Sequence, residues 1–213
     1  MPQSFLPRNF FDLSSFSFND IFTGADTPWE VLPKINIYIK NKFKIKTTRP
    51  NYKNRKDVYV GKGTVIEKDV VIKGPAIIGE NCYLESGCLL RENCILGDNV
   101  HLGHGAEIKN SIIMNDTAIA HFNYVGDSII GNNVNFSAGA ITANLRLDKK
   151  PVSVKAGKRK IATGLRKFGA LIGDGAVVGV NSVLNPGTIL GKNCIVYPLT
   201  SVAGLHKDNE VIK

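Results

Sequence analysis

An aliphatic residue recurs at every sixth position from Val60 onward, and a small residue follows it four places later. The pairs in the first half of the repeat are Val60 and Thr64, Ile66 and Val70, Ile72 and Ala76, Ile78 and Cys82, Leu84 and Cys88, Leu90 and Cys94, Leu96 and Val100, Leu102 and Ala106, and Ile108 and Ile112. After a skip of one residue, the period resumes with Ile113 and Thr117 and with Ile119 and Asn123. Each unit of such a repeat buries its apolar face only by stacking on its neighbours.

Six residues are enough for one short strand and the corner that follows it. Three such units, about eighteen residues, close a triangular coil, and the next coil stacks about 4.8 Å away at ordinary strand spacing. The aliphatic and the small residue both point inward, where the three walls converge. The pattern therefore predicts an all-β fold, a parallel β-helix of hexapeptide repeats that spans residues 57–202.

Residues 1–56 do not follow the repeat. They contain an apolar cluster of Phe10, Phe11, Leu13, Phe16, Phe18, Ile21 and Phe22. Asp26-Thr27-Pro28 is typical of a helix start, and Trp29, Leu32 and Ile35 share one helical face. Because terminal repeats need a cap, we expect a small helical cap on the open end of the stack. A stripe that binds a partner protein is the alternative.

Lysines then alternate with other residues, at Lys40, Lys42, Lys44 and Lys46. This period predicts a strand with its lysines on one face, a common protection of exposed edges. The basic run continues with Arg49, Lys53, Arg55 and Lys56. We do not expect it to bind nucleic acid, because no recognition motif accompanies it.

The repeat is interrupted once, by a basic insertion at residues 145–168. A loop of this length inside a regular stack is usually functional or disordered. The period resumes at Ile172 and continues to Val202, and residues 203–213 form a short polar tail for which the sequence predicts no structure.

The chain has 213 residues and a net charge of +9, which indicates anionic partners such as nucleic acid or phosphorylated small molecules. Its four cysteines, Cys82, Cys88, Cys94 and Cys194, all occupy the inward small position, so we interpret them as core residues. There is no signal segment and no long apolar run. We therefore expect a cytoplasmic protein with no membrane partner.

Two basic residues occupy equivalent positions of successive coils. Arg91 and Lys109 are eighteen residues apart, and each follows an inward aliphatic residue. Stacked cations repel unless an anion lies between them, and a phosphate is the natural one. Two separate solvated surface charges are the alternative.

Two histidines also share a register. His104 and His121 each lie two places after an aliphatic residue, and the one-residue skip explains their separation of seventeen. Stacked imidazoles suggest a metal site as one alternative. A histidine metal site of this kind would need three ligands, however, and only two histidines share the register, because His101 is out of it. We predict no metal.

The segment from His121 to Asp127, HFNYVGD, and the segment from Gly131 to Asn144, GNNVNFSAGAITAN, carry a specific resemblance. They resemble the acetyltransferase half of the bacterial bifunctional glucosamine-1-phosphate acetyltransferase and N-acetylglucosamine-1-phosphate uridylyltransferase. The strongest similarity runs from about Arg91 to Asn144. It implies a left-handed coil and a homotrimer with acceptor clefts between neighbouring subunits.

The resemblance also implies roles for individual residues. His121 is the expected general base, and Asn144 lies near the reacting amine. The residues expected to hold a sugar phosphate are Arg91, Lys109, Tyr124, Asn135 and Lys150. Ala138 and Val180 are expected on the side of acetyl-CoA, the co-substrate, although the family carries a serine where this chain has Val180. The family's arginine-bearing C-terminal tail has no counterpart here.

We therefore expect an acetyl-CoA-dependent N-acetyltransferase that acts on an amino-sugar 1-phosphate in nucleotide-sugar biosynthesis. Glucosamine-1-phosphate is the acceptor we expect first among these. An unperturbed histidine can take the amine proton near neutral pH, and backbone N–H groups of residues 137–140 are candidates for the oxyanion. No nucleotide-binding domain is recognisable in residues 1–56, so we expect no nucleotidyl transfer and a separate uridylyltransferase. The alternatives are a metal-dependent hydratase of the γ-carbonic anhydrase type and a non-catalytic sugar-phosphate-binding scaffold.

Overall fold

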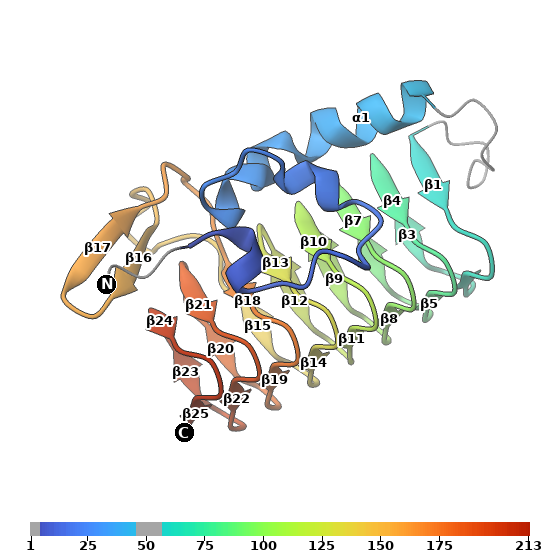
Figure 1. The fold of residues 1–213 in the computed structure, drawn as a ribbon. Coiled ribbons are helices and arrows are strands. Elements are labelled where there is room, and N and C mark those ends of the chain that lie inside the picture. The colour runs from blue at the N-terminus through green and yellow to red at the C-terminus, as the bar shows by residue number, and fades with distance from the viewer. Residues whose placement is uncertain (1–4, 46–56) are drawn as a thin grey trace.

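A computed structural model describes residues 5–45 and 57–213. Short parallel strands wind into a coil with three flat walls, and helical segments lie along one of them (Figure 1). The fold class predicted from the hexapeptide repeat is confirmed, and the arrangement is consistent with a left-handed β-helix. Among the described residues, no helix is both long and apolar enough to cross a membrane.

Each wall is one parallel sheet built from every third strand. Wall A contains β1 (Val58–Val60), β4 (Ala76–Ile78), β7 (Cys94–Leu96), β10 (Ser111–Ile113), β13 (Ile129–Ile130), β18 (Ala170–Ile172), β21 (Thr188–Leu190) and β24 (Leu205–His206). Wall B contains β2 (Val65–Ile66), β5 (Tyr83–Leu84), β8 (His101–Leu102), β11 (Ala118–Ile119), β14 (Asn135–Phe136), β19 (Val177–Val178), β22 (Ile195–Val196) and β25 (Val211–Ile212). Wall C contains β3 (Val71–Ile72), β6 (Leu89–Leu90), β9 (Glu107–Lys109), β12 (Tyr124–Gly126), β15 (Ile141–Thr142), β20 (Val183–Leu184) and β23 (Ser201–Val202).

The interior is formed by the aliphatic and small residues of the repeat. Leu84, Leu90, Leu96 and Leu102 are completely buried in one continuous cluster that runs through the coil. All four cysteines are buried and unpaired within it, as predicted. Burial raises the pKa of the Cys88 thiol to about 11 and that of Cys94 to about 12, so these thiols stay protonated and serve as packing groups.

The corners require backbone with positive φ, which asparagine and aspartate tolerate better than most residues. Asn81, Asn99 and Asn133 all have φ between 54° and 58°. Phe122 adopts the same conformation at φ 54° with 68% of its surface exposed. A bulky aromatic residue in this region is strained, and it directly follows His121.

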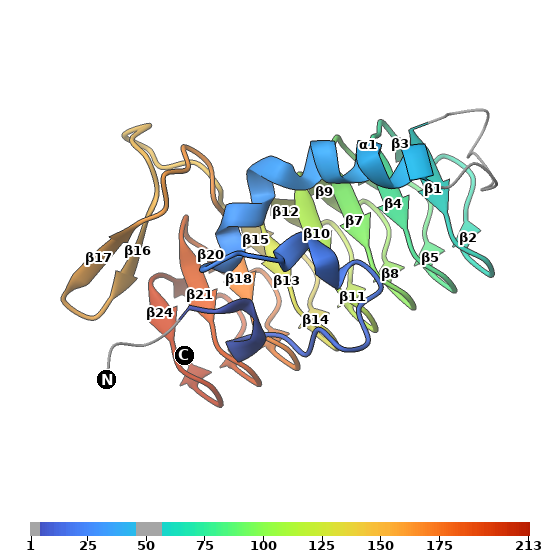
Figure 2. The same ribbon diagram turned by 45° about the horizontal axis from the view of Figure 1, so that its top comes forward.

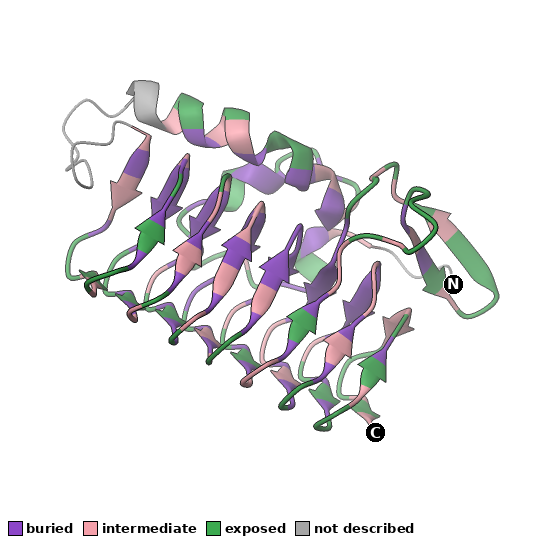
Figure 3. Cartoon of the chain, turned by 180° about the vertical axis from the view of Figure 1, so that it is seen from behind, coloured by how far each residue is buried: buried purple, intermediate pink, exposed green. Residues whose placement is uncertain are grey.

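The N-terminal cap lies along wall A and not on the open end of the coil, where the sequence placed it (Figures 1 and 2). It consists of η1 (Pro7–Asn9), η2 (Asn19–Phe22), η3 (Pro28–Lys34) and α1 (Ile35–Ile45). Its aromatic residues form one cluster with the outward side chains of wall A, among them Ile77, Ile95, Ile112, Ile129, Leu171 and Ile189. Strands of wall A are therefore buried on both faces (Figure 3).

The predicted helix from Pro28 is confirmed, with a 3₁₀ segment before the α-helix. The predicted lysine-rich strand is wrong, because α1 continues through residue 45. Ile35 and Ile39, one turn apart, are fully buried against wall A, and this tertiary contact outweighs the alternating pattern. Lys42 instead pairs with Asp20 at 2.8 Å. Lys46 and the basic run from Arg49 to Lys56 lie outside the described residues.

The basic insertion folds into an antiparallel hairpin of β16 (Ser153–Ala156) and β17 (Arg159–Ala162). A bridge between Leu145 and Lys167 closes its base. Val152 and Val154 are fully buried, which anchors the hairpin beside the cap. Beyond residue 202, where the sequence predicted no structure, β24 and β25 pair with β21 and β22 and add further strands to the coil.

Candidate active site

Arg91 and Lys109 lie in the same column on the outer face of wall C. Strands β6 and β9 pair Leu90 with Ile108, so the residues that follow these two are neighbours on successive turns. Each cation, however, has its own carboxylate. Arg91 contacts Glu107 at 3.1 Å, and Lys109 contacts Asp127 at 2.9 Å. The two positive charges are therefore balanced within the chain, and they retain the stacked arrangement that a phosphate could bridge.

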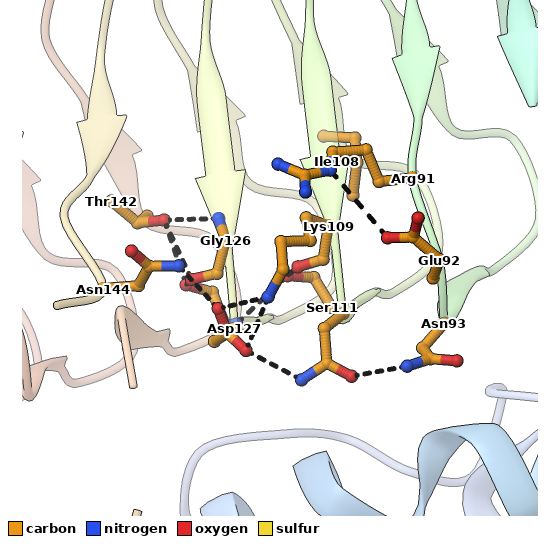
Figure 4. A network of polar contacts seen from close by, with 12 residues as sticks. Arg91, Glu92, Asn93, Ile108, Lys109, Ser111, Gly126, Asp127, Thr142 and Asn144 are labelled. Atoms are coloured by element: carbon orange, nitrogen blue, oxygen red, sulfur yellow. Dashed lines mark hydrogen bonds and ion pairs between the residues drawn. The ribbon is translucent and has the colours of Figure 1, made fainter. Parts of the chain in front are cut away.

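Asp127 is the centre of a polar cluster at the corner between walls C and A (Figure 4). Asp127 is buried, with only 5% of the residue exposed. It accepts hydrogen bonds from Lys109 Nζ at 2.9 and 3.2 Å, from Asn110 Nδ2 at 2.9 Å and from Asn144 Nδ2 at 2.5 Å. A buried charge with this many donors is rigidly placed, so Asp127 fixes the side chains of Lys109 and Asn144. Asp127 lies within the motif from His121 to Asp127, but the motif predicted no role for it.

Tyr124 lies along wall C toward this cluster. Its hydroxyl accepts a hydrogen bond from Asn144 Nδ2 at 3.1 Å. A Cβ atom at Gly126 would lie 2.4 Å from the tyrosine hydroxyl and 2.7 Å from Asn144 Nδ2, so only glycine leaves room for this contact. Burial raises the pKa of Tyr124. The phenol therefore remains a neutral donor that can bind an acceptor group of a ligand.

Three more of the predicted residues stack in a column at the corner between walls B and C. The pairing of β11 with β14 and of β14 with β19 places His121, Ala138 and Val180 at equivalent positions of successive turns. The carbonyl oxygen of His121 accepts a hydrogen bond from the N–H of Gly139 at 2.8 Å. Val180 is exposed. His104 occupies the same column one turn before His121.

The His121 side chain is 54% exposed, and its Nδ1 lies 3.8 Å from Glu85 Oε2. The hydrogen bond from His101 is the main cause that lowers the pKa of Glu85. The carboxylate is therefore negative at neutral pH. His121 is thus accessible and lies beside a negatively charged side chain.

The backbone of residues 137–140 was the sequence-based candidate for an oxyanion site. Ser137 N donates to Val178, Gly139 N to His121 and Ala140 N to Ser137. No acceptor within residues 5–45 and 57–213 is recorded for the N–H of Ala138. Of this stretch, Ala138 therefore supplies the backbone donor that remains available to a ligand in the same column as His121.

Two predicted substrate residues lie away from the wall C cluster. Asn135 is exposed on wall B, and Lys150 is exposed in the insertion, where its backbone N–H bonds Asp148. A different lysine of the insertion, Lys167, lies close to Asn144. Lys167 forms an antiparallel β-bridge with Leu145, and the N–H of the following residue, Phe168, donates to the Asn144 carbonyl at 3.0 Å. Lys167 was not predicted as a site residue, because the contact that closes the base of the insertion is a tertiary contact.

A cleft of about 690 Å³ separates the insertion from the coil. It is lined by Ala143, Leu145, Arg146, Leu147, Asp148, Ser153, Lys155, Asn185, Pro186, Gly187, Ala203 and Gly204. Its basic lining residues are Arg146 and Lys155.

No group of three potential metal ligands is found in the part of the chain that the structure describes. His104 and His121 do share a register, as the sequence indicated. His104 Nδ1, however, lies 2.6 Å from the carbonyl oxygen of Ser86, so it donates its proton there. The ring also meets Phe122 edge-on at 5.2 Å. His104 is thus held by contacts within the chain.

Comparison with known proteins gives a consistent result. Residues 72–159 match the family model described as the GMPPB C-terminal domain. The bifunctional protein GlmU of Methanococcus vannielii is 43% identical over 116 residues, which cover 51% of this chain and 28% of that protein. The coil is related to GlmU. This confirms the resemblance drawn from the motifs between Arg91 and Asn144.

A second relative is the bifunctional sugar-1-phosphate nucleotidylyltransferase/acetyltransferase of Sulfurisphaera tokodaii, 45% identical over 92 residues. That match covers 43% of this chain and 23% of the relative. The chain therefore spans about a quarter of the length of these two proteins. Among solved structures, an N-acyltransferase variant from Bacillus cereus in complex with dTDP and coenzyme A is similar, with a TM-score of 0.48 and 15% identity over 71% of this chain and 76% of that chain.

Proposed function

We propose that this protein is an acetyl-CoA-dependent N-acetyltransferase whose acceptor is an amino-sugar 1-phosphate, with glucosamine-1-phosphate preferred. The observation that carries the proposal is the wall C cluster, in which Lys109, Asp127, Asn144 and Tyr124 form one connected network beside Arg91. The similarity to the bifunctional sugar-1-phosphate nucleotidylyltransferase/acetyltransferase of Sulfurisphaera tokodaii supports the same chemistry.

The phosphate of the acceptor would lie between Arg91 and Lys109. Arg91 bonds Glu107 through Nη1, so its guanidinium group retains donors for a phosphate oxygen. Lys109 has three donors, and Asp127 leaves part of that capacity for a phosphate oxygen. Tyr124 and Asn135 would bind sugar hydroxyls. Lys150, and also Lys167 from its place at the base of the insertion, would add positive charge.

His121 would act as the general base that removes a proton from the attacking amine. The negative Glu85 carboxylate at 3.8 Å would stabilise the resulting imidazolium. The N–H of Ala138 would stabilise the oxyanion, with Val180 beside the acyl donor. Transfer would be direct from acetyl-CoA, because the buried cysteines have a raised pKa and cannot serve as nucleophiles.

A homotrimer would complete the site. The wall C cluster and the His121 column lie at different edges of the same wall, and a cleft between subunits would bring one edge of each coil toward its neighbour. The exposed cations of the hairpin, Lys155, Lys158, Arg159 and Lys160, would then contact phosphates of acetyl-CoA across the interface. We place this reaction in the cytoplasm, in UDP-N-acetylglucosamine synthesis with a separate uridylyltransferase.

The test is release of free coenzyme A thiol when the protein is mixed with acetyl-CoA and a panel of amino-sugar 1-phosphates. We expect thiol release that depends on the acceptor and is greatest with glucosamine-1-phosphate. A panel in which no acceptor stimulates thiol release, although the sugar phosphates bind in calorimetry, would identify a non-catalytic scaffold. Bicarbonate formation from carbon dioxide would instead support the metal-dependent hydratase.

A further inference from the structure

A row of side-chain amides connects the cap to the polar cluster of wall C. Asn36, on helix α1, donates from Nδ2 to Asn93 Oδ1 at 2.7 Å. Asn93 donates to Asn110 Oδ1 at 3.3 Å, and Asn110 donates to Asp127 Oδ1 at 2.9 Å. Three amides from two distant parts of the sequence thus end on the carboxylate that holds Lys109 and Asn144.

The direction of this row follows from its last member. An ionised carboxylate only accepts hydrogen bonds, so Asn110 must turn its NH₂ group toward Asp127. The carbonyl of Asn110 then faces Asn93, which must present its own NH₂ group, and the same rule orients Asn36. All three amides therefore point their donors toward Asp127, and each bond polarises the next.

The first member of the row is rigidly held. Asn36 follows Ile35, which is fully buried against wall A, and Ile39 one turn later is fully buried as well. The position of the amide is therefore fixed by how the cap packs on the coil. The next residue, Ile37, is 61% exposed, so a substitution there leaves the row intact.

We propose that Asn36 is a positioning residue for the acceptor site. Through Asn93 and Asn110 it holds the Asp127 carboxylate in the orientation that places Lys109 and Asn144. The cap thereby takes part in binding the sugar phosphate in addition to covering wall A. The kinetic part of this inference rests on the proposed acetyl transfer.

The substitution Asn36→Asp separates positioning from cap attachment. The new carboxylate can still bond Asn93 if the Asn93 amide turns over, so the link between cap and coil is kept. Turning over Asn93 sets its carbonyl against that of Asn110. If Asn110 also turns, its carbonyl faces the Asp127 carboxylate. In the first case the hydrogen bond between Asn93 and Asn110 is lost, and in the second the one between Asn110 and Asp127. In both cases Asp127 is held less firmly.

We expect Asn36→Asp to raise KM for the amino-sugar phosphate about tenfold, the equivalent of one charge-assisted hydrogen bond, with KM for acetyl-CoA and Tm nearly unchanged. Asn36→Leu removes only the terminal donor and should raise the same KM about twofold to threefold. Ile37→Asp adds the same charge at the next position and should match the wild type. Equal kinetics for Asn36→Asp and Ile37→Asp would overturn the proposal.

A second measurement does not depend on catalysis. The side-chain ¹⁵N–¹H resonances of Asn110 and Asn144 should move in Asn36→Asp and stay in place in Ile37→Asp. If the wild-type protein acetylates no amino-sugar phosphate, the proposed function fails, and these resonances still decide on the amide row. Unmoved resonances in Asn36→Asp would refute the row itself.

Discussion

Replacement of His121 by alanine separates the acetyltransferase from its rivals most directly. The side chain is 54% exposed and its nearest charged partner, Glu85, is 3.8 Å away. Its loss removes no packed core group, so the free energy of unfolding should change by less than about 0.5 kcal/mol. The variant should therefore fold like the wild type, and any kinetic loss can be assigned to chemistry.

The expected loss follows from the role of a general base. Proton transfer in the transition state typically contributes about 10² to 10⁴ in rate. Because His121→Ala removes that interaction alone, kcat should fall by this factor while KM for both substrates stays within about twofold. The loss should shrink as pH rises, because more of the acceptor amine is then already unprotonated.

The assay is thiol release at saturating acetyl-CoA and acceptor, measured from about pH 6 to 9 around the ordinary titration range of histidine. The matched control is His104→Ala, in the same column one turn earlier, whose Nδ1–H bonds the Ser86 carbonyl. We expect that variant to retain most of its activity, and we expect the wild type to tolerate a strong chelator. A His121→Ala enzyme within tenfold of wild type would refute the general-base assignment. Activity lost to the chelator and restored by zinc would establish the metal reading instead.

Four further outcomes follow from the contacts described above. Arg91→Ala should raise KM for the acceptor about tenfold or more, with KM for acetyl-CoA unchanged, because a charge-assisted contact contributes about 1.5–3 kcal/mol; an unchanged acceptor KM would make Arg91 a plain surface charge. Lys109→Ala should lower the free energy of unfolding by about 3–5 kcal/mol in denaturant titrations, since it strands the buried carboxylate of Asp127, and Asp127→Ala in the same chain should recover part of that loss. Ile112→Ala, beneath the cap and fully buried, should cost about 2–5 kcal/mol, whereas Ile37→Ala on the exposed side of α1 should cost little; similar values for both would contradict the packing of the cap on wall A. Multi-angle light scattering should give the mass of a trimer, and a fully active monomer would exclude shared sites.

The coil was predictable because one physical requirement repeats along the chain. Where three walls converge, each unit contributes one larger apolar residue and one small residue to the interior, and this constraint appears as a period of six. The same register correctly stacked Arg91 on Lys109 and His104 on His121. Contacts that depend on register alone can thus be derived from the sequence.

Contacts between separate segments could not be derived in this way. The repeat pattern does not predict that Glu107 and Asp127 pair with the two cations, because such pairing depends on the direction of side chains on successive turns. The placement of the cap was missed for a similar reason. Adjacent aliphatic residues such as Ile77-Ile78 give no signal for it, because wall B contains Val177-Val178 and wall C contains Leu89-Leu90.

The cap also changes how the coil should unfold. In a simple solenoid each turn touches only the turns above and below it, so the ends can fray independently. Here one N-terminal segment bonds turns that are far apart: Phe10 accepts the N–H of Asp174, Ser15 bonds Asn115, and Asn36 bonds Asn93. Loss of any one turn therefore loosens the segment that holds the others. The cap makes a one-dimensional stack behave as a single cooperative unit.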